Sequence, residues 1–154
     1  MSITVTTRSE ITVVETLTLG PGATDRFTDA GINTTQLKLG AGSTSPVSLK
    51  AHFAQALVAG AASIDLLALV GTQGQTLATT GKRVQAIKVQ NPNTHELAVT
   101  PHSTNGYGLT FTVPQQGEVL ITSTNLLPAV GSAAHLLDLT GDGTETSNWM
   151  IILG

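Results

Sequence analysis

The sequence of 154 residues contains no cysteine, and only 11 % of its residues are charged and 3 % are aromatic. Without cysteine there can be no disulfide, no cysteine-based zinc site and no thiol nucleophile, so packing or oligomerisation must stabilise the fold. The formal net charge is −3, and the few lysines and arginines form no cluster that could contact phosphates. We therefore expect no nucleic-acid partner.

Long hydrophobic segments are also missing. The longest apolar stretch, residues 53–70, is interrupted by Gln55, Gly60 and Asp65, which is too much polarity for a membrane span. The N-terminus lacks the charged segment followed by an apolar one that marks a secretory signal. We expect a protein that is made in the cytoplasm and has no membrane partner.

Uncharged residues therefore cover much of the surface. Hydrophobic residues make up 40 % of the chain, the mean hydropathy is +0.19, and threonine is abundant. Threonine favours extended backbone, and its hydroxyl keeps an exposed strand face hydrated. A chain of this length forms about one domain, whose surface is covered either by threonine, serine and glycine or by another subunit.

Alternating apolar and polar residues predict most of the strands in the second part of the chain. Predicted strands cover 47–53, 63–70, 84–90, 97–100, 109–113, 118–122, 134–139 and 149–153, with turn residues between them. The alanine-rich run 54–62 is compatible with a helix, but Gly60 favours strand and turn. Roughly eight short strands about ten residues apart predict a jelly-roll-like antiparallel β-sandwich.

The first part of the chain has a different character. Strands are predicted at 3–7, 10–19 and 35–39, and residues 23–32 are predicted to be a loop with a helical turn near Phe27. The segment 40–46 is rich in Gly and Ser and ends in Pro46, as linkers do. We expect an N-terminal β arm over residues 1–45 and a sandwich core over residues 46–154.

Residues that could carry out catalysis are scattered. The four histidines, His52, His95, His102 and His135, lie in four segments without the short spacing of metal ligands, although a distant pair stays open. No serine lies in a Gly-x-Ser-x-Gly motif. Two carboxylate pairs, Glu10 with Glu15 and Glu96 with Glu118, are available for glycoside chemistry, but aromatic platforms for sugars are scarce. We expect no enzyme and no cofactor.

One acidic segment resembles a calcium-binding loop. Residues 138–145 place oxygen-bearing side chains at alternate positions around Gly141, but position twelve is Trp149 instead of a carboxylate. A hairpin turn at Asp142 and Gly143 accounts for the same residues without a metal. Calcium binding at Asp138 and Asp142 is kept as part of an alternative function.

Several segments of the core resemble small head proteins of tailed bacteriophages. They are Ile64 to Gly74, Lys82 to Pro92, Asn105 to Tyr107 and Ile151 to Gly154. In particular, the last two thirds of the chain look like jelly-roll decoration, or cement, proteins of the capsid surface. The resemblance implies a homotrimer on the virion that contacts the major capsid protein, with the N-terminal segment joining subunits.

The leading hypothesis is therefore a capsid decoration protein that stabilises the capsid through contacts between subunits. The alternative is a ligand-binding β-sandwich that recognises a carbohydrate or a receptor, with or without calcium. The residues expected to make contacts are apolar positions of the arm and a polar loop of the core: Ile3, Val5, Ile11, Val13, Leu17, Thr72, Gln73 and Gln75.

Overall fold

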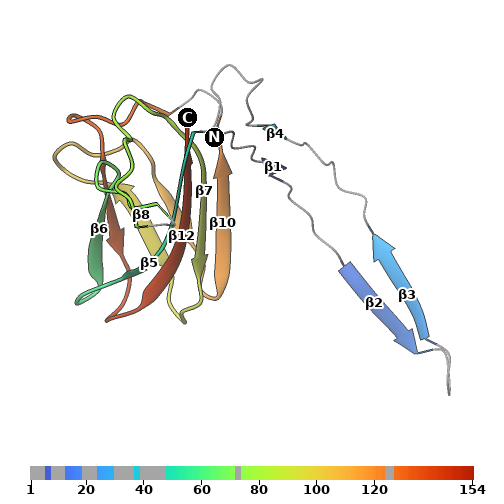
Figure 1. Cartoon of the computed structure of the whole chain (residues 1–154). Helices are drawn as coiled ribbons and strands as arrows, with labels where there is room; N and C mark the ends of the chain where they lie inside the picture. Colours follow the sequence, from blue (N-terminus) through green and yellow to red (C-terminus); the bar gives the residue numbers. More distant parts are fainter. Residues whose placement is uncertain are drawn as a thin grey trace.

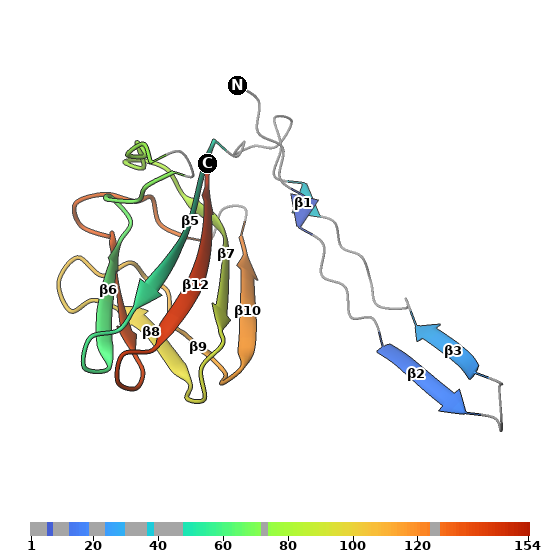
Figure 2. The same ribbon diagram turned by 60° about the horizontal axis from the view of Figure 1, so that its bottom comes forward.

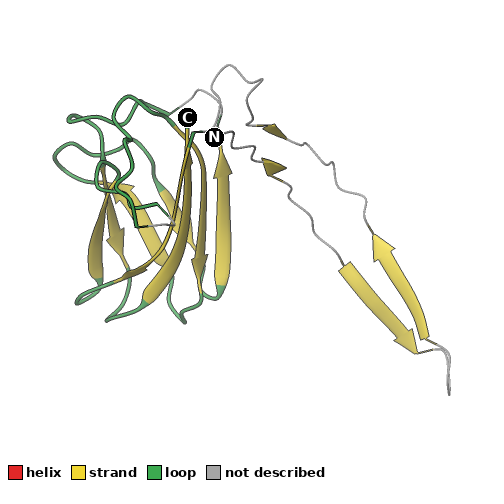
Figure 3. Ribbon diagram, viewed as in Figure 1, coloured by secondary structure: helices red, strands yellow, loops and turns green. Residues whose placement is uncertain are grey.

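The computed structural model describes residues 6–7, 13–18, 24–29, 37–38, 48–71, 74–123 and 127–154, and for the first four ranges only the backbone. Every regular element in these ranges is a β-strand (Figure 3). This part of the chain contains no helix that is long and apolar enough to cross a membrane. The prediction of an all-β protein is confirmed.

Eight strands form two antiparallel sheets of four that face each other (Figure 1). In spatial order, the first sheet consists of β10 (Gly117–Thr122), β7 (Val84–Asn91), β12 (Thr146–Leu153) and β5 (Leu49–Ala56). The second consists of β6 (Ala61–Asp65), β11 (Leu136–Thr140), β8 (Leu97–Pro101) and β9 (Phe111–Val113). Strands β5 and β6 lie at one side of the sandwich, and β9 and β10 at the other.

The strand pairing is nested. In chain order, the first strand of the sandwich pairs with the eighth, the second with the seventh, the third with the sixth and the fourth with the fifth. This order results when one long antiparallel hairpin is rolled into two facing sheets, which is the eight-stranded jelly roll. The predicted sandwich and its number of core strands are confirmed.

The core lies where alternate side chains of the two sheets meet. Trp149 of β12 is fully buried, and its ring stacks on Phe53 of β5 with ring centroids 6.4 Å apart. Phe111 of β9 packs on the same ring from the other sheet, also at 6.4 Å. The indole N–H donates to the Ser147 hydroxyl at 2.8 Å, so the buried polar atom of the tryptophan is satisfied.

The closed side of the sandwich, formed by β9 and β10, is fixed from inside by a buried amide. Asn91, the last residue of β7, is 1 % exposed. Its Nδ2 lies 2.7 Å from the carbonyl oxygen of His95 and 3.2 Å from that of Pro114, in the turn between β9 and β10. Its Oδ1 accepts from the Asn93 side chain at 2.8 Å. One side chain therefore connects the ends of β7, β8 and β9.

Four further strands precede the sandwich and form an arm. Strand β2 (Val13–Thr18) pairs antiparallel with β3 (Thr24–Asp29), and β1 (Thr6–Thr7) pairs with β4 (Leu37–Lys38). Figures 1 and 2 show this two-stranded ribbon standing apart from the two sheets. The predicted boundary between arm and core, at residues 45 and 46, lies outside the described residues.

Two local predictions are wrong. The segment 23–32, predicted to be a loop, contains strand β3, because β2 supplies a partner for its backbone hydrogen bonds. The strand predicted over 63–70 ends at Asp65, whose side-chain Oδ1 accepts from the Leu67 N–H at 2.8 Å and turns the chain. The preference for strand and turn over helix at 54–62 is confirmed by β5, a turn and β6.

Candidate functional site

The four histidines lie in different parts of the sandwich. His52 lies in β5, and His95 lies in the turn between β7 and β8. His102 follows β8, and its Nδ1 lies 2.8 Å from the carbonyl oxygen of Thr104. His135 precedes β11, and its Nδ1 lies 3.0 Å from the carbonyl oxygen of Gly131. The described residues contain no group of three His, Asp or Glu side chains that could hold a metal ion.

His95 takes part in a small ionic cluster at one end of the sandwich. Its Nδ1 lies 2.9 Å from Oε1 of Glu145 and 3.5 Å from Oδ2 of Asp142, both from the turn between β11 and β12. The hydrogen bond to Glu145 raises the pKa of His95 above its ordinary value, with help from the negative charge of Asp142. These contacts connect the turn between β7 and β8 with the turn between β11 and β12.

The described acidic residues that were considered for calcium and for glycoside chemistry lie in separate elements of the fold. Asp138 lies within β11, whereas Asp142 lies in the turn beyond it, where Gly143 has φ +51° as a tight hairpin turn requires. Glu118 pairs with Lys88 at 3.0 Å, and this contact lowers the pKa of Glu118. Glu10 lies outside the described residues, and Glu15 lies in β2 of the arm.

The open side, between β5 and β6, is a candidate place for a partner to bind. These two strands are consecutive in the chain but belong to different sheets, so they diverge from the turn that joins them. A loop from Leu66 to Gly71 crosses the gap at the far end, where Gly71 bridges to Ala51 of β5. Strands β5 and β6, the turn between them and the loop 66–71 therefore surround a space on this side of the sandwich, which we call the frame.

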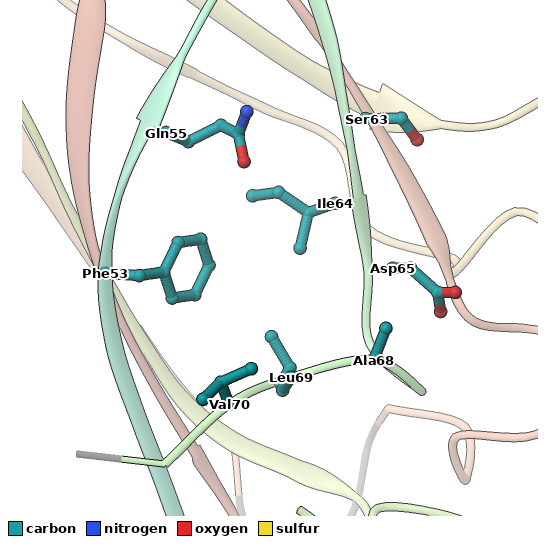
Figure 4. Close-up of a pocket in the computed structure, with 8 residues that line it drawn as sticks. All are labelled: Phe53, Gln55, Ser63, Ile64, Asp65, Ala68, Leu69 and Val70. Atoms are coloured by element: carbon teal, nitrogen blue, oxygen red, sulfur yellow. The ribbon is translucent and has the colours of Figure 1, made fainter. Parts of the chain in front are cut away.

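Inside this frame lies a hollow of about 270 Å³. Figure 4 shows Phe53, Gln55 and Ile64 pointing into the space between β5 and β6, with Leu69 and Val70 at one end of it. Ser63 and Asp65 point away from the hollow, and the Ser63 hydroxyl donates to the carbonyl oxygen of Leu137 at 3.2 Å. The hollow is therefore mainly apolar.

Two large hydrophobic side chains on this side of the sandwich are exposed. Val58 is 77 % exposed and Val70 is 49 % exposed, the two highest values among the large hydrophobic residues of the described part. No charged residue occurs between His52 and Asp65. A concave and mainly apolar surface is the usual form of a binding site, so the hollow is the candidate site of the sandwich.

The contact residues predicted from the sequence have mixed outcomes. Ile3, Val5, Ile11, Thr72 and Gln73 lie outside the described residues. Val13 and Leu17 lie in β2, whose backbone alone is described. Gln75 is exposed, and its side chain packs so closely over Gly71 that a Cβ there would lie 2.5 Å from Nε2 of Gln75. Gln75 therefore lies next to the loop that borders the hollow, and its predicted contact role stays a prediction.

Val58 and Val70 were not among the predicted contact residues. The sequence signal that points to Val58 is the uncharged run 53–64, which does not reach Val70. An uncharged segment is also what a protein interface requires, since the centres of interfaces are depleted in charge.

Comparison with known proteins adds no family. No protein-family model and no curated protein sequence matches the chain. The functional interpretation therefore rests on the sequence and on the geometry described above.

Proposed function

We propose that this chain is a structural protein of a virus particle: a capsid decoration protein that binds the outer capsid surface and stabilises it through contacts between subunits. Its partners would be the major capsid protein and other copies of itself. The jelly roll alone does not decide this, because capsid proteins, lectins and cupins share that architecture.

The observation that carries the proposal is the arm. Within the described residues, each arm strand pairs with another arm strand and with no strand of the sandwich. An isolated two-stranded ribbon is marginally stable in water, so the arm gains stability when it lies on another surface. A protein that joins subunits needs such a segment, whereas a monomeric enzyme does not.

The sandwich offers further support. Its outer residues include few charges, and residues buried in protein interfaces are depleted in charged side chains. A protein that binds across several capsid subunits stabilises the assembled state by mass action, without any chemistry of its own.

The test combines the purified full-length chain with capsids of the encoding virus that lack it. We expect the chain to sediment with the capsids and to raise the temperature at which they disrupt. Replacing Val13 and Leu17 of β2 with aspartate should weaken binding at least about tenfold, which corresponds to about 1.4 kcal/mol.

The matched control is Thr112→Asp, an exposed position of β9 on the sandwich, which should bind as the unaltered chain does. A chain that stays in the supernatant, or an arm variant that binds normally, would contradict the proposal. The homotrimer rests on the resemblance to decoration proteins, and light scattering of the free protein measures it.

A further inference from the structure

The two faces of the ribbon formed by β2 and β3 differ in chemistry. Residues directly opposite each other in an antiparallel pair lie on the same face, and alternate residues of one strand share a face. The register of the two strands therefore places three acidic and three apolar residues on one face, which we call the acidic face. Its members, in cross-strand pairs, are Val13 with Asp29, Glu15 with Phe27 and Leu17 with Asp25.

The opposite face of the ribbon carries a single charge. The register places four threonines on it, and we call it the threonine face. Its members, in cross-strand pairs, are Val14 with Thr28, Thr16 with Arg26 and Thr18 with Thr24. Because the threonine hydroxyl keeps an exposed strand face hydrated, this face suits solvent. The acidic face is the one that combines charge with apolar residues.

Each apolar residue of the acidic face lies directly opposite an acidic one. A surface that covers Val13, Leu17 or Phe27 therefore covers a carboxylate as well. Taking an ionised carboxylate out of water without a partner costs more free energy than the burial of one apolar side chain returns. A partner can cover this face favourably only if it supplies lysine or arginine groups for the carboxylates.

This requirement excludes two classes of partner. Nucleic acids and anionic membranes are negatively charged, so both repel a face that carries three carboxylates and no cation. An uncharged apolar surface is also excluded, because it would leave the carboxylates without partners. What fits is a protein surface with basic and apolar side chains.

The sandwich of another copy does not match the acidic face. Its described part contains four lysine and arginine residues. Lys88 is paired with Glu118 at 3.0 Å, and Arg83 donates to a backbone carbonyl oxygen at 2.6 Å. The other two are in separate elements, Lys50 in β5 and Lys82 just before β7. A different protein is therefore the better source of cations for three carboxylates.

We infer that the arm binds its partner through the acidic face, and that this partner is a protein surface where lysine or arginine groups lie next to apolar side chains. The inference rests on the proposed function, in which this surface belongs to the capsid. Binding should weaken as the salt concentration rises, because salt screens the attraction between opposite charges.

A defined probe tests this chemistry without capsids. It is an immobilised peptide of alternating lysine and leucine, with a peptide of alternating glutamate and leucine as the reference. The unaltered full-length chain should bind only the first peptide. The variant Glu15→Gln with Asp25→Asn and Asp29→Asn should bind it at least about tenfold more weakly, which corresponds to about 1.4 kcal/mol.

The first control tests the opposite face of the same ribbon. Thr16→Gln with Thr24→Asn and Thr28→Asn places the same kinds of amide on the threonine face, in the same two strands. Any loss of strand propensity is therefore similar to that in the acidic-face variant. This control should bind the peptide as the unaltered chain does.

The second control matches the change in net charge. Glu96→Gln with Asp138→Asn and Asp142→Asn removes three carboxylates from the sandwich instead of the arm. It should also bind the peptide normally. In the capsid assay, only the acidic-face variant should bind at least about tenfold more weakly than the unaltered chain.

Four results would overturn the inference. They are an unaltered chain that does not bind the lysine–leucine peptide, an acidic-face variant that binds the peptide or the capsids normally, equal weakening in either control, and loss of the free protein's oligomer in the acidic-face variant by light scattering. The last result would make another copy the partner. A chain that binds the peptide through the acidic face but does not bind capsids would contradict the proposed function alone.

Discussion

The closed and open sides of the sandwich contain the same kinds of elements but differ in packing and polarity. Each side is bounded by two edge strands and a tight turn containing a non-glycine residue with positive φ. At the closed side, Asn91 holds the turn from inside and Gln116 keeps its tip polar. At the open side the strands diverge, the interior is exposed in a hollow, and the tip is apolar. The two edges are therefore covered differently: a hydrogen-bonded turn covers the closed side, and a loop that leaves a hollow covers the open side.

The largest expected effect concerns the closed side. Asn91→Ala removes the buried amide that donates to the carbonyl oxygens of His95 and Pro114 and accepts from the Asn93 side chain, so these hydrogen bonds are lost together. We expect a loss of about 2–3 kcal/mol in the free energy of unfolding and a fall of roughly 5–10 °C in Tm. Calorimetry measures both.

The control for Asn91→Ala is Gln90→Ala, the adjacent but exposed amide, which should change Tm by less than about 2 °C. If the two variants melted alike, the closed side would not depend on the buried amide, and the contrast between the sides would lose its physical basis.

A smaller, stabilising effect is expected at the two turn tips. Glycine adopts positive φ without the steric cost that alanine and glutamine incur, so Ala59→Gly and Gln116→Gly should each raise the free energy of unfolding by about 0.5–1 kcal/mol. Chemical denaturation of both variants measures the two values side by side.

The control is Ala54→Gly in strand β5, where the backbone is extended. There glycine should lower the free energy of unfolding instead of raising it. Equal gains at the two tips would sharpen the comparison, because they would leave polarity as the only difference between the tips. A destabilised Ala59→Gly would show that the alanine methyl group contributes within the isolated subunit.

The smallest expected effect is a pH dependence of Tm. It comes from His95 and does not depend on the difference between the open and closed sides. Because Glu145 and Asp142 raise the pKa of His95, the protonated form stabilises the folded state. This contribution is fully present below pH 6.5, the ordinary pKa, and is lost as the pH rises through the raised value. His95→Gln should therefore show a flatter dependence of Tm on pH than the unaltered chain.

His102→Gln, in another turn, serves as the control for the pH series and should retain the dependence. A proton titration followed by NMR at His95 gives the direction of the shift directly. A pKa below the ordinary histidine value would contradict the arrangement with Glu145 and Asp142.

The strands of the sandwich were predictable because their burial repeats every second residue. In β5, the side chains of Ala51 and Phe53 face inward while those of Lys50 and His52 are exposed, and this alternation is visible in the sequence. The turn at Gly60 was predictable for another local reason, because glycine is unfavourable inside a helix. Strand β3 was not, because Asp25, Arg26 and Asp29 have low strand propensity and only the pairing with β2 makes the segment extended.

The candidate site was harder to predict, since it depends on contacts between segments far apart in the chain. Nothing local in 53–64 shows that β5 and β6 enter different sheets and leave a hollow between them. Similarly, the difference between Ala59 and Gln116 has meaning only once both are known to occupy the same backbone conformation. The arm residues proposed as contacts remain predictions.

The nested pairing of the strands has a consequence for biosynthesis. Strand β12, the last strand of the sandwich in chain order, lies between β5 and β7, which are made far earlier. Until β12 arrives, the first sheet lacks an inner strand and Trp149, so the nascent chain exposes the apolar faces of its earlier strands. Topologies in which distant segments must meet fold slowly and are prone to aggregation meanwhile. The stage before β12 is in place is therefore the one at which we expect this chain to aggregate most readily.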